Sequence, residues 1–213
     1  MIKPIIMLIA MSGMGASSGV QAQSLSGDIG IYNKYLDYDL FPLTDQPVIQ
    51  GSLYAGVTEE CSLMAWSSHG IATSEGGELD VGAICYVPIV EGTVTLYGLR
   101  SFLRGAADAW TIAAGYEYGG ADLTVEQYFW DGNPDGTRII AGYTHEGIEG
   151  LIMRPLLTYE TGLGVAEMLA GGLAAEYALT GGVSLTARGL APLIKDKSGL
   201  RTAELQFGLR HSF

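Results

Sequence analysis

The last nine residues of the chain are Leu205-Gln206-Phe207-Gly208-Leu209-Arg210-His211-Ser212-Phe213. Side chains alternate between the two faces of a β-strand, so this stretch has one apolar and one polar face if it is extended. The apolar face holds Leu205, Phe207, Leu209 and Phe213, and His211 is its one imperfect position. The pattern predicts a strand with an apolar medium on one side and a polar medium on the other.

Outer-membrane β-barrels of Gram-negative bacteria commonly end on such a strand, with a final aromatic residue facing lipid, and this terminus resembles theirs. The resemblance implies that outer-membrane lipid surrounds the protein and that the barrel-assembly machinery reads the C-terminal strand. We therefore expect the cell outer membrane of a Gram-negative bacterium as the location.

Residues 1–22 have the pattern of a cleavable secretory signal peptide. Lys3 supplies the positive start, Ile5 to Ala10 the apolar run, and Val20-Gln21-Ala22 a small-residue cleavage site. The apolar run is too short to span a bilayer as a helix. We expect residues 23–213 to form a single domain, the barrel itself.

The composition favours a membrane barrel over a soluble β-sandwich. Glycine accounts for 31 of 213 residues, charged residues make up 16%, and the mean hydropathy is +0.25. No apolar stretch after residue 22 is long enough for a transmembrane helix, and apolar residues spread in alternation are what a barrel requires. The net charge of −12 argues against a nucleic-acid partner, because phosphate binding needs a basic surface.

Alternation and glycine-rich turns predict an all-β fold, a closed antiparallel transmembrane barrel of about twelve strands with both termini periplasmic. The least clear segment is 163–180, where Val165, Leu169 and Leu173 stand at helical spacing. A helix is the alternative there, although Gly171-Gly172 weakens it, and a barrel of ten strands is then the alternative. The predicted strands are 27–36, 47–57, 61–71, 77–89, 92–103, 108–118, 121–131, 137–146, 150–160, 166–179, 182–193 and 200–213.

The predicted connections fall into two classes. Those after even-numbered strands are tight, such as Gly119-Gly120 and Gly147-Ile148-Glu149, and those after odd-numbered strands are often longer, such as 37–46. Outer-membrane barrels have short periplasmic turns and longer extracellular loops, so this sorting favours a barrel.

Two patches of sequence carry a resemblance to a known family. The first is Gly27-Asp28-Ile29-Gly30, Tyr35 and Pro47-Val48-Ile49-Gln50-Gly51, and the second is Gly77-Glu78-Leu79-Asp80 followed by Gly82. They resemble the TorF family of small outer-membrane porins, although Asp37-Tyr38-Asp39-Leu40 stands where members often carry Arg-Gly-x-Ser. The resemblance covers about a third of the mature chain. It implies a barrel with a pore and supplies no catalytic or ligand residues.

Cys61 and Cys85 would lie on neighbouring strands, roughly in register across a hairpin centred near Thr73–Ser74. An oxidising compartment allows a disulfide between them, and two small apolar side chains facing lipid are the alternative. Geometry decides between the two, so the sequence leaves the bond open.

Residue patterns for catalysis and metal binding are incomplete. Gly15-Ala16-Ser17-Ser18-Gly19 matches a nucleophile elbow but lies in the signal segment. Asp131-Gly132-Asn133-Pro134-Asp135-Gly136 begins like a calcium loop, but Gly142 stands where the bidentate Glu should be. His69 has serines beside it along one strand, where a catalytic hydrogen bond does not form easily. We expect no enzyme activity, no catalytic or metal-binding residue and no cofactor; a lipid hydrolase is the third and least favoured hypothesis.

Extending the alternation places thirteen charged side chains on the inner face. An Arg or Lys facing lipid at the bilayer midplane costs roughly 2–4 kcal/mol, which keeps such residues inside. A wet channel with an acidic excess favours cations, whereas paired charges plug a narrow lumen. The leading hypothesis is passive passage of small solutes or ions with a mild cation preference, and the alternative is a non-conducting barrel with a structural or surface-binding role. The thirteen are Asp28, Lys34, Asp80, Glu117, Asp122, Glu126, Arg138, Arg154, Glu160, Glu176, Arg188, Glu204 and Arg210.

Arg100 does not fit the alternation, because it shares a face with Val94 and Leu96. A β-bulge in the fifth predicted strand or a position at the outer rim would account for it. The sequence does not choose between these two explanations.

Tyrosine is the commonest aromatic residue, with 12 copies beside Trp66, Trp110 and Trp130. Such rings suit the two lipid–water boundaries, but aromatic residues are also ordinary strand formers. The sequence does not separate these two roles.

Overall fold

The computed structural model describes residues 24–36, 42–72, 77–104, 107–132, 135–162, 165–194 and 202–213. The predicted signal peptide and several loop centres lie outside these ranges. Within the described ranges, no helix is long and apolar enough to cross a membrane.

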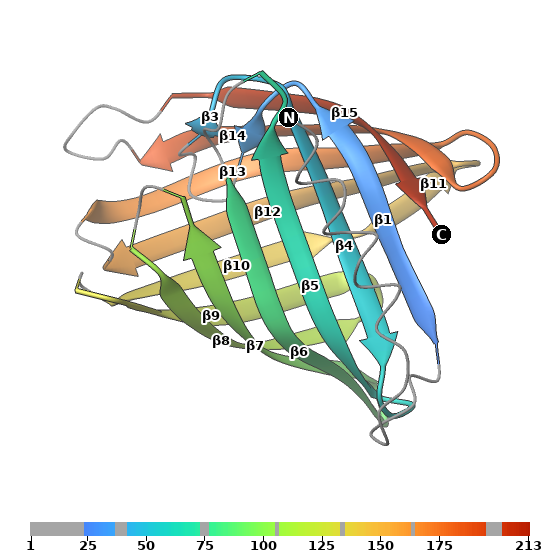
Figure 1. Ribbon diagram of the computed structural model, residues 1–213. Helices are drawn as coiled ribbons and strands as arrows, with labels where there is room; N and C mark the ends of the chain where they lie inside the picture. The colour runs from blue at the N-terminus through green and yellow to red at the C-terminus, as the bar shows by residue number, and fades with distance from the viewer. Residues whose placement is uncertain are drawn as a thin grey trace, which may run out of the picture.

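Twelve strands form a closed ring in which every strand is antiparallel to its two neighbours (Figure 1). Strands that follow one another along the chain are neighbours, and β15 pairs with β1 to close the ring. Closure pairs every strand edge, as a hydrocarbon medium requires. The strands of the ring are β1 (Leu25–Tyr32), β4 (Val48–Gly56), β5 (Cys61–Gly70), β6 (Glu78–Ile89), β7 (Gly92–Leu103), β8 (Ala109–Tyr118), β9 (Ala121–Trp130), β10 (Gly136–Tyr143), β12 (Leu151–Gly162), β13 (Val165–Ala178), β14 (Val183–Ile194) and β15 (Glu204–Ser212).

The predicted closed barrel of twelve strands is confirmed, and the ten-strand alternative is wrong. The helical alternative at 163–180 is wrong too, because β13 pairs with β12 on one side and β14 on the other. Leu169 and Leu173 are four residues apart, a spacing that also keeps two side chains on one face of a strand. A Cβ at Gly172 would lie 2.3 Å from the Gly189 carbonyl oxygen, so glycine allows β14 to approach closely here.

The outer wall of the barrel is apolar. On β8, Trp110 and Ile112 are exposed while Ala109, Thr111 and Ala113 are buried, so the side chains alternate as predicted. The C-terminal strand shows the same alternation: Phe207 and Leu209 are exposed and Gln206 is buried, and Phe213 beyond the strand is exposed as well. An apolar wall of this kind suits contact with lipid.

The connection after β10 differs from the predicted tight turn at Gly147-Ile148-Glu149. A short strand, β11 (His145–Ile148), continues the hairpin and pairs with β12 through an irregular register. The reversal therefore occurs at Glu149-Gly150, where Gly150 has a φ of 75°. Glycine takes up this left-handed conformation without the cost that a Cβ would bring.

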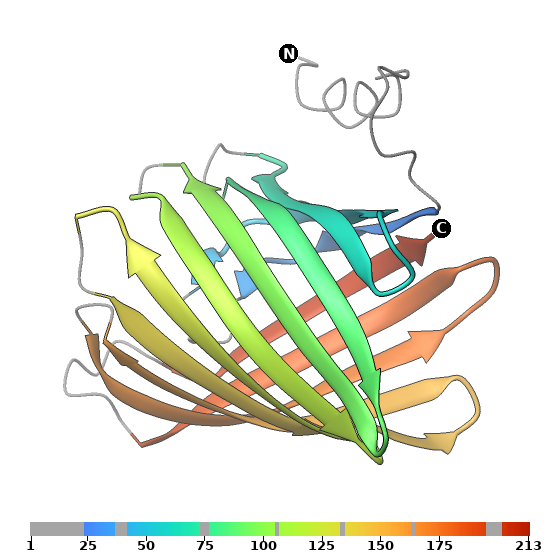
Figure 2. The same cartoon turned by 90° about the horizontal axis from the view of Figure 1, so that it is seen from below.

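Residues 33–36, the described residues that follow β1, fold into the barrel. The predicted first strand, 27–36, ends early at Tyr32, and the chain bends at Asn33 and Lys34 before the short strand β2 (Tyr35–Leu36). Strand β2 pairs with β3 (Pro42–Thr44) in a separate small sheet. We call residues 33–36 the strap. Figure 2 shows β2 and β3 within the outline of the barrel rather than outside it.

Arg100 lies near the end of β7, and the register of β7 with β6 and β8 is unbroken. A bulge in β7 is therefore excluded, and a position at the outer rim accounts for Arg100. Its guanidinium bonds Asp131 at 2.7 Å and Asp108 at 3.3 Å and lies over the Trp110 ring.

Cys61 and Cys85 are joined by a disulfide and stand directly opposite each other on β5 and β6. The bond lies at the end of this hairpin away from its connecting loop. It ties the two strands together where the loop does not.

Candidate functional site

A cavity of about 530 Å³ lies inside the barrel. Its wall includes side chains from the strap and from strands all around the ring, and it carries four carboxylates and four guanidinium groups. Aromatic rings and aliphatic side chains such as Leu36, Leu99 and Ile152 also line it. The charged residues of the wall are Glu78, Asp80, Glu126, Glu176, Arg138, Arg154, Arg188 and Arg210, and the aromatic ones are Tyr32, Tyr35, Trp66, Tyr97 and Tyr128.

Seven of the thirteen side chains predicted to face the lumen contribute to this wall: Asp80, Glu126, Arg138, Arg154, Glu176, Arg188 and Arg210. Asp122, Glu160 and Glu204 bond to Arg154, Arg138 and Lys34, respectively. Asp28 lies in register with Ser52 of β4, and Glu117 is exposed near the end of β8.

A buried ion cluster joins three neighbouring strands on one wall. Arg138 of β10 is in register with Glu126 of β9 and with Glu160 of β12. Its Nε donates to Glu160 at 3.2 Å and its Nη1 to Glu126 at 3.3 Å. The hydroxyls of Tyr97 and Tyr128 also donate to Glu126. All three charged groups are buried, so the cluster provides the pairing that a buried charge needs.

A second ion pair passes over a glycine. Arg154 of β12 donates to Asp122 of β9 through Nε at 3.0 Å and Nη2 at 2.5 Å, although β10 lies between these strands. Gly142 of β10 stands in register with Asp122, and a Cβ there would lie 2.6 Å from Arg154 Nε and 2.7 Å from Asp122 Oδ1. The missing side chain of Gly142 leaves the space in which the two groups meet.

A third pair spans β14 in the same way. Arg210 of β15 donates to both carboxylate oxygens of Glu176 on β13, at 2.6 and 2.5 Å. On β14 itself, Arg188 donates to the amide oxygen of Gln206 at 3.3 Å. These contacts join adjacent or next-adjacent strands. They therefore run along the wall of the barrel and leave the cavity between the walls.

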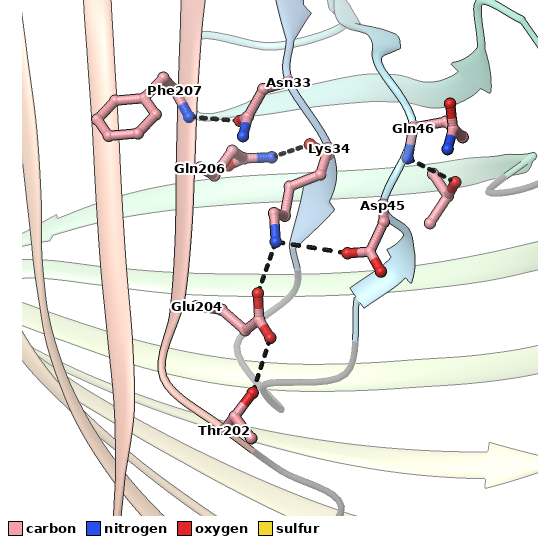
Figure 3. Close-up of polar contacts among 9 residues, drawn as sticks. Asn33, Lys34, Asp45, Gln46, Thr202, Glu204, Gln206 and Phe207 are labelled. Atoms are coloured by element: carbon pink, nitrogen blue, oxygen red, sulfur yellow. Dashed lines mark hydrogen bonds and ion pairs between the residues drawn. The ribbon is translucent and has the colours of Figure 1, made fainter.

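The strap is fixed to the last strand of the barrel (Figure 3). Asn33 accepts a bond from the Phe207 amide at 2.7 Å, and the Lys34 carbonyl accepts one from Gln206 at 2.8 Å. Lys34 Nζ lies 2.6 Å from Glu204 and 3.4 Å from Asp45. The hydrogen bond to Glu204 is the main cause that raises the pKa of Lys34 above its ordinary value.

The inner end of the strap contacts two opposite walls. Tyr35 donates to Glu78 of β6 at 2.5 Å, and its ring lies 5.5 Å from the ring of Trp66 on β5. Leu36 is fully buried in a cluster with inward residues of β12, β13 and β14. The strap therefore narrows the lumen from within; the other members of the cluster are Leu156, Met168, Ala170 and Leu190.

The charges of the inner face are sorted between two halves of the ring. We call β1 and β4 to β8 the acidic half: its inward charged residues are Asp28, Glu78, Asp80 and Glu117, and no Lys or Arg among its described residues faces inward. The remaining strands, β9, β10 and β12 to β15, are the paired half, where Arg138, Arg154 and Arg210 form ion pairs with carboxylates.

Sequence reasoning missed Glu78 and the aromatic lining. Glu78 shares a strand face with Asp80, so extending the alternation by one more position would have included it. Trp66 and Tyr97 occupy inward positions on β5 and β7, whereas Trp110 is exposed on the outer wall. Aromatic residues therefore serve both inside and outside the barrel.

A serine beside His69 and the first residue of the calcium-like segment each bond to another side chain. Ser68 is buried and bonded to Gln50, while His69, the next residue, is exposed. Asp131, the first residue of the calcium-like segment, bonds Arg100 at the rim. Within the described ranges, no three His, Cys, Asp or Glu side chains gather as metal ligands.

A scan against models of protein families found no match, and a search of curated proteins found none either. The resemblance to the TorF family therefore stays a prediction.

Solved structures of small porins have the same fold as this chain. KdgM porin superposes with a TM-score of 0.60 at 9% sequence identity, over 88% of this chain and 99% of that one. A second KdgM structure, in complex with disordered oligogalacturonate, gives 0.60 at 7% identity over 89% and 98%. NanC porin gives 0.56 at 9% identity, over 89% and 99%. The chain therefore has the closed antiparallel transmembrane barrel fold of the KdgM and NanC porins.

Proposed function

We propose that this protein is an outer-membrane channel through which small solutes and ions diffuse passively, with a mild preference for cations. The observation that carries the proposal is a cavity with charged side chains in its wall, inside a closed barrel whose ion pairs run along that wall. Because these charged side chains pair with one another along the wall, they leave space in the lumen for water and solute. The fold shared with KdgM and NanC porins supports the same proposal.

Support for the cation preference comes from the turns at the end of the barrel that carries the C-terminus. Glutamates are exposed on three of these turns: Glu59 and Glu60 before β5, Glu91 before β7, and Glu149 before β12. The wall of the cavity carries equal numbers of acidic and basic groups, so these turns add negative charge to a balanced wall. A ring of like charge at a mouth concentrates counter-ions, and salt screens this effect.

Planar-bilayer recording of the purified protein tests the proposal. We expect stepwise conductance in KCl and, under a salt gradient, a reversal potential on the cation side. Replacing Glu59, Glu60 and Glu91 by Gln should move the reversal potential toward zero while the steps persist. A heat-denatured sample is the control for adventitious leaks. Purified barrel that inserts without producing steps would reject the channel.

The second candidate is a non-conducting barrel, and the strap is the observation that favours it. Tyr35 and Leu36 pack against opposite walls and occupy part of the lumen. A double variant, Tyr35→Ala with Leu36→Ala, separates the candidates. A plugged barrel would be silent as wild type and would conduct as the variant, whereas a channel conducts as both and the variant gives larger steps.

The location and the assembly partner belong to the same proposal. Phe213 donates to and accepts from the backbone of Gly27 at 3.0 Å in each direction, which fastens the end of β15 to the start of β1. We expect deletion of Phe213 to remove most of the folded protein from the outer membrane, because the assembly machinery reads this strand. Heat-modified mobility on gels of membrane fractions measures the folded amount, with His211→Ala as the matched control. Normal assembly without Phe213 would contradict this part of the proposal.

A further inference from the structure

The inner face of the barrel is exposed at one end and buried toward the other. On β12, Ile152 is 39% exposed near the end of the barrel that carries the C-terminus, whereas Thr158, six residues further on the same face, is fully buried. On β13, Glu176 exposes 30% of its side chain near the same end, whereas Met168 near the opposite end is buried. We call these two ends of the barrel the C-terminal end and the strap end.

The strap accounts for the buried end. Leu36 packs against β12, β13 and β14, and Tyr35 contacts β5 and β6. In the ring of twelve strands, β6 is six strands from β13 in either direction, so these two strands face each other across the lumen. Because consecutive side chains of a strand point to opposite sides, the two residues of β2 reach both walls at once. The strap therefore crosses the lumen.

The wall beside the strap, formed by β7 to β10, leaves little room at the strap end. Ser101, Thr111 and Arg138 line the cavity there, and each is at most 7% exposed. Near the C-terminal end, by contrast, Arg154 and Arg210 expose 25% and 32% of their side chains although both are in ion pairs. Water therefore reaches the inner face at the C-terminal end much more freely than at the strap end.

The burial of three other inward residues, Ile84, Ala113 and Ser184, has a local cause. Ile84 and Ala113 stand in register with Tyr97 on either side of β7, and Ser184 stands in register with Arg210. Side chains directly opposite each other on neighbouring strands are in contact, so the longer one covers the shorter one. These three residues therefore do not mark a second constriction.

We infer that the cavity is a one-sided vestibule that solutes enter from the C-terminal end, and that the strap reduces its other end to a passage for small ions. The volume of about 530 Å³ falls within the range of about 300–1,000 Å³ that is usual for small-molecule sites. The passage of ions past the strap rests on the proposed channel function. The one-sided access to the cavity does not, so the two can be tested separately.

The first test measures access to two inward threonines in the detergent-solubilised barrel. Thr186 lines the cavity and is half-buried, whereas Thr158 is fully buried on the strap side. A bulky charged maleimide should modify Thr186→Cys at least about tenfold faster than Thr158→Cys, because a buried group reacts only after local opening. Wild-type protein is the control, since its two cysteines are bonded to each other. Equal rates for the two variants would overturn the vestibule.

The same reaction tests the role of the strap. With Tyr35→Ala and Leu36→Ala added, Thr158→Cys should react nearly as fast as Thr186→Cys, because Leu36 no longer covers the buried cluster. Continued protection of Thr158→Cys would show that another part of the barrel closes this end and would overturn the assignment to the strap.

The second test uses single channels in a planar bilayer, with tetraethylene glycol added to one face at a time. This small neutral polymer should lower the conductance from one face only, and from both faces in the strap variant. Equal effects from the two faces of the wild-type channel would overturn the one-sided vestibule and keep the channel. Selective modification of Thr186→Cys without any conductance steps would keep the vestibule and overturn the channel.

Discussion

The acidic half and the paired half of the barrel are held together by different means. In the paired half, buried ion pairs link strand to strand, as in the cluster of Glu126, Arg138 and Glu160. In the acidic half, a disulfide ties β5 to β6, and no inward Lys or Arg stands among the described residues of its strands. The difference teaches that inward charge acts as structural support where it is paired and buried. In the acidic half, a covalent bond between neighbouring strands supplies part of the support instead.

The largest effect is expected in the paired half. Arg138→Met would leave two buried glutamates without their shared cation, and removing one partner of a buried ion pair costs about 3–5 kcal/mol. Urea unfolding of the detergent-solubilised barrel measures the loss. Arg210→Met is the matched control, since Arg210 and its partner Glu176 are each about 30% exposed, and the loss of a partly exposed pair should cost much less. If the two variants lost similar amounts of unfolding free energy, buried ion pairs would not support the barrel more than exposed ones.

The disulfide is the corresponding support of the acidic half. Replacing Cys61 and Cys85 by Ala should lower the free energy of unfolding by about 3 kcal/mol, because the bond restricts a long loop of the unfolded chain. The same urea experiment measures this value, and reduction of the wild-type protein should reproduce it. Unchanged stability would show that the pairing of β5 with β6 suffices without the bond.

A smaller effect tests the ion pair that passes over Gly142. Gly142→Ala places a methyl group where Arg154 and Asp122 meet and should cost about 1 kcal/mol, as displacement of a partly exposed ion pair would. Gly98→Ala is the control, because a Cβ there meets only one atom, at 3.9 Å. The comparison fails if the two glycine variants unfold at the same urea concentration.

The smallest effect concerns Lys34, which joins the strap to β15. The pKa of Lys34 is raised in the folded protein, so its ion pair with Glu204 stabilises the fold fully below the ordinary lysine pKa of 10.5. This stabilisation is lost as the pH rises through the pKa of Lys34 in the folded protein. A partly exposed ion pair such as Lys34–Glu204 contributes less than about 1 kcal/mol to the free energy of unfolding. Unfolding measured between pH 9 and pH 12 should show this loss in the wild type and not in Lys34→Met. Lys34→Arg, which stays charged, should not show it either.

The strands of the barrel were predictable because alternation and glycine turns recur along the chain, and each strand needs only its own sequence to be recognised. The strap was not predictable in the same way. The predicted first strand, 27–36, ran through Tyr35 and Leu36, and only the bend at Asn33 and Lys34 separates these two residues from β1. The depth to which Leu36 is buried depends on β12, β13 and β14, which lie more than a hundred residues away.

The candidate site was predictable to the extent that it follows from alternation. Asp80, Arg188 and Arg210 were placed on the inner face by the same rule that placed the strands. The pairing of Arg154 with Asp122 was not predictable, because it crosses a third strand at a position without a side chain. The pairing of each carboxylate with a guanidinium depends on the register between neighbouring strands. Local sequence does not specify this register.

The attachment of the strap to β15 sets an order of events in biogenesis. Asn33 and Lys34 are made early, but their partners Phe207, Gln206 and Glu204 belong to the last strand to be synthesised. These three bonds can therefore form only once β15 is in place. The anchoring of the strap inside the lumen is therefore linked to the closure of the ring by its last strand.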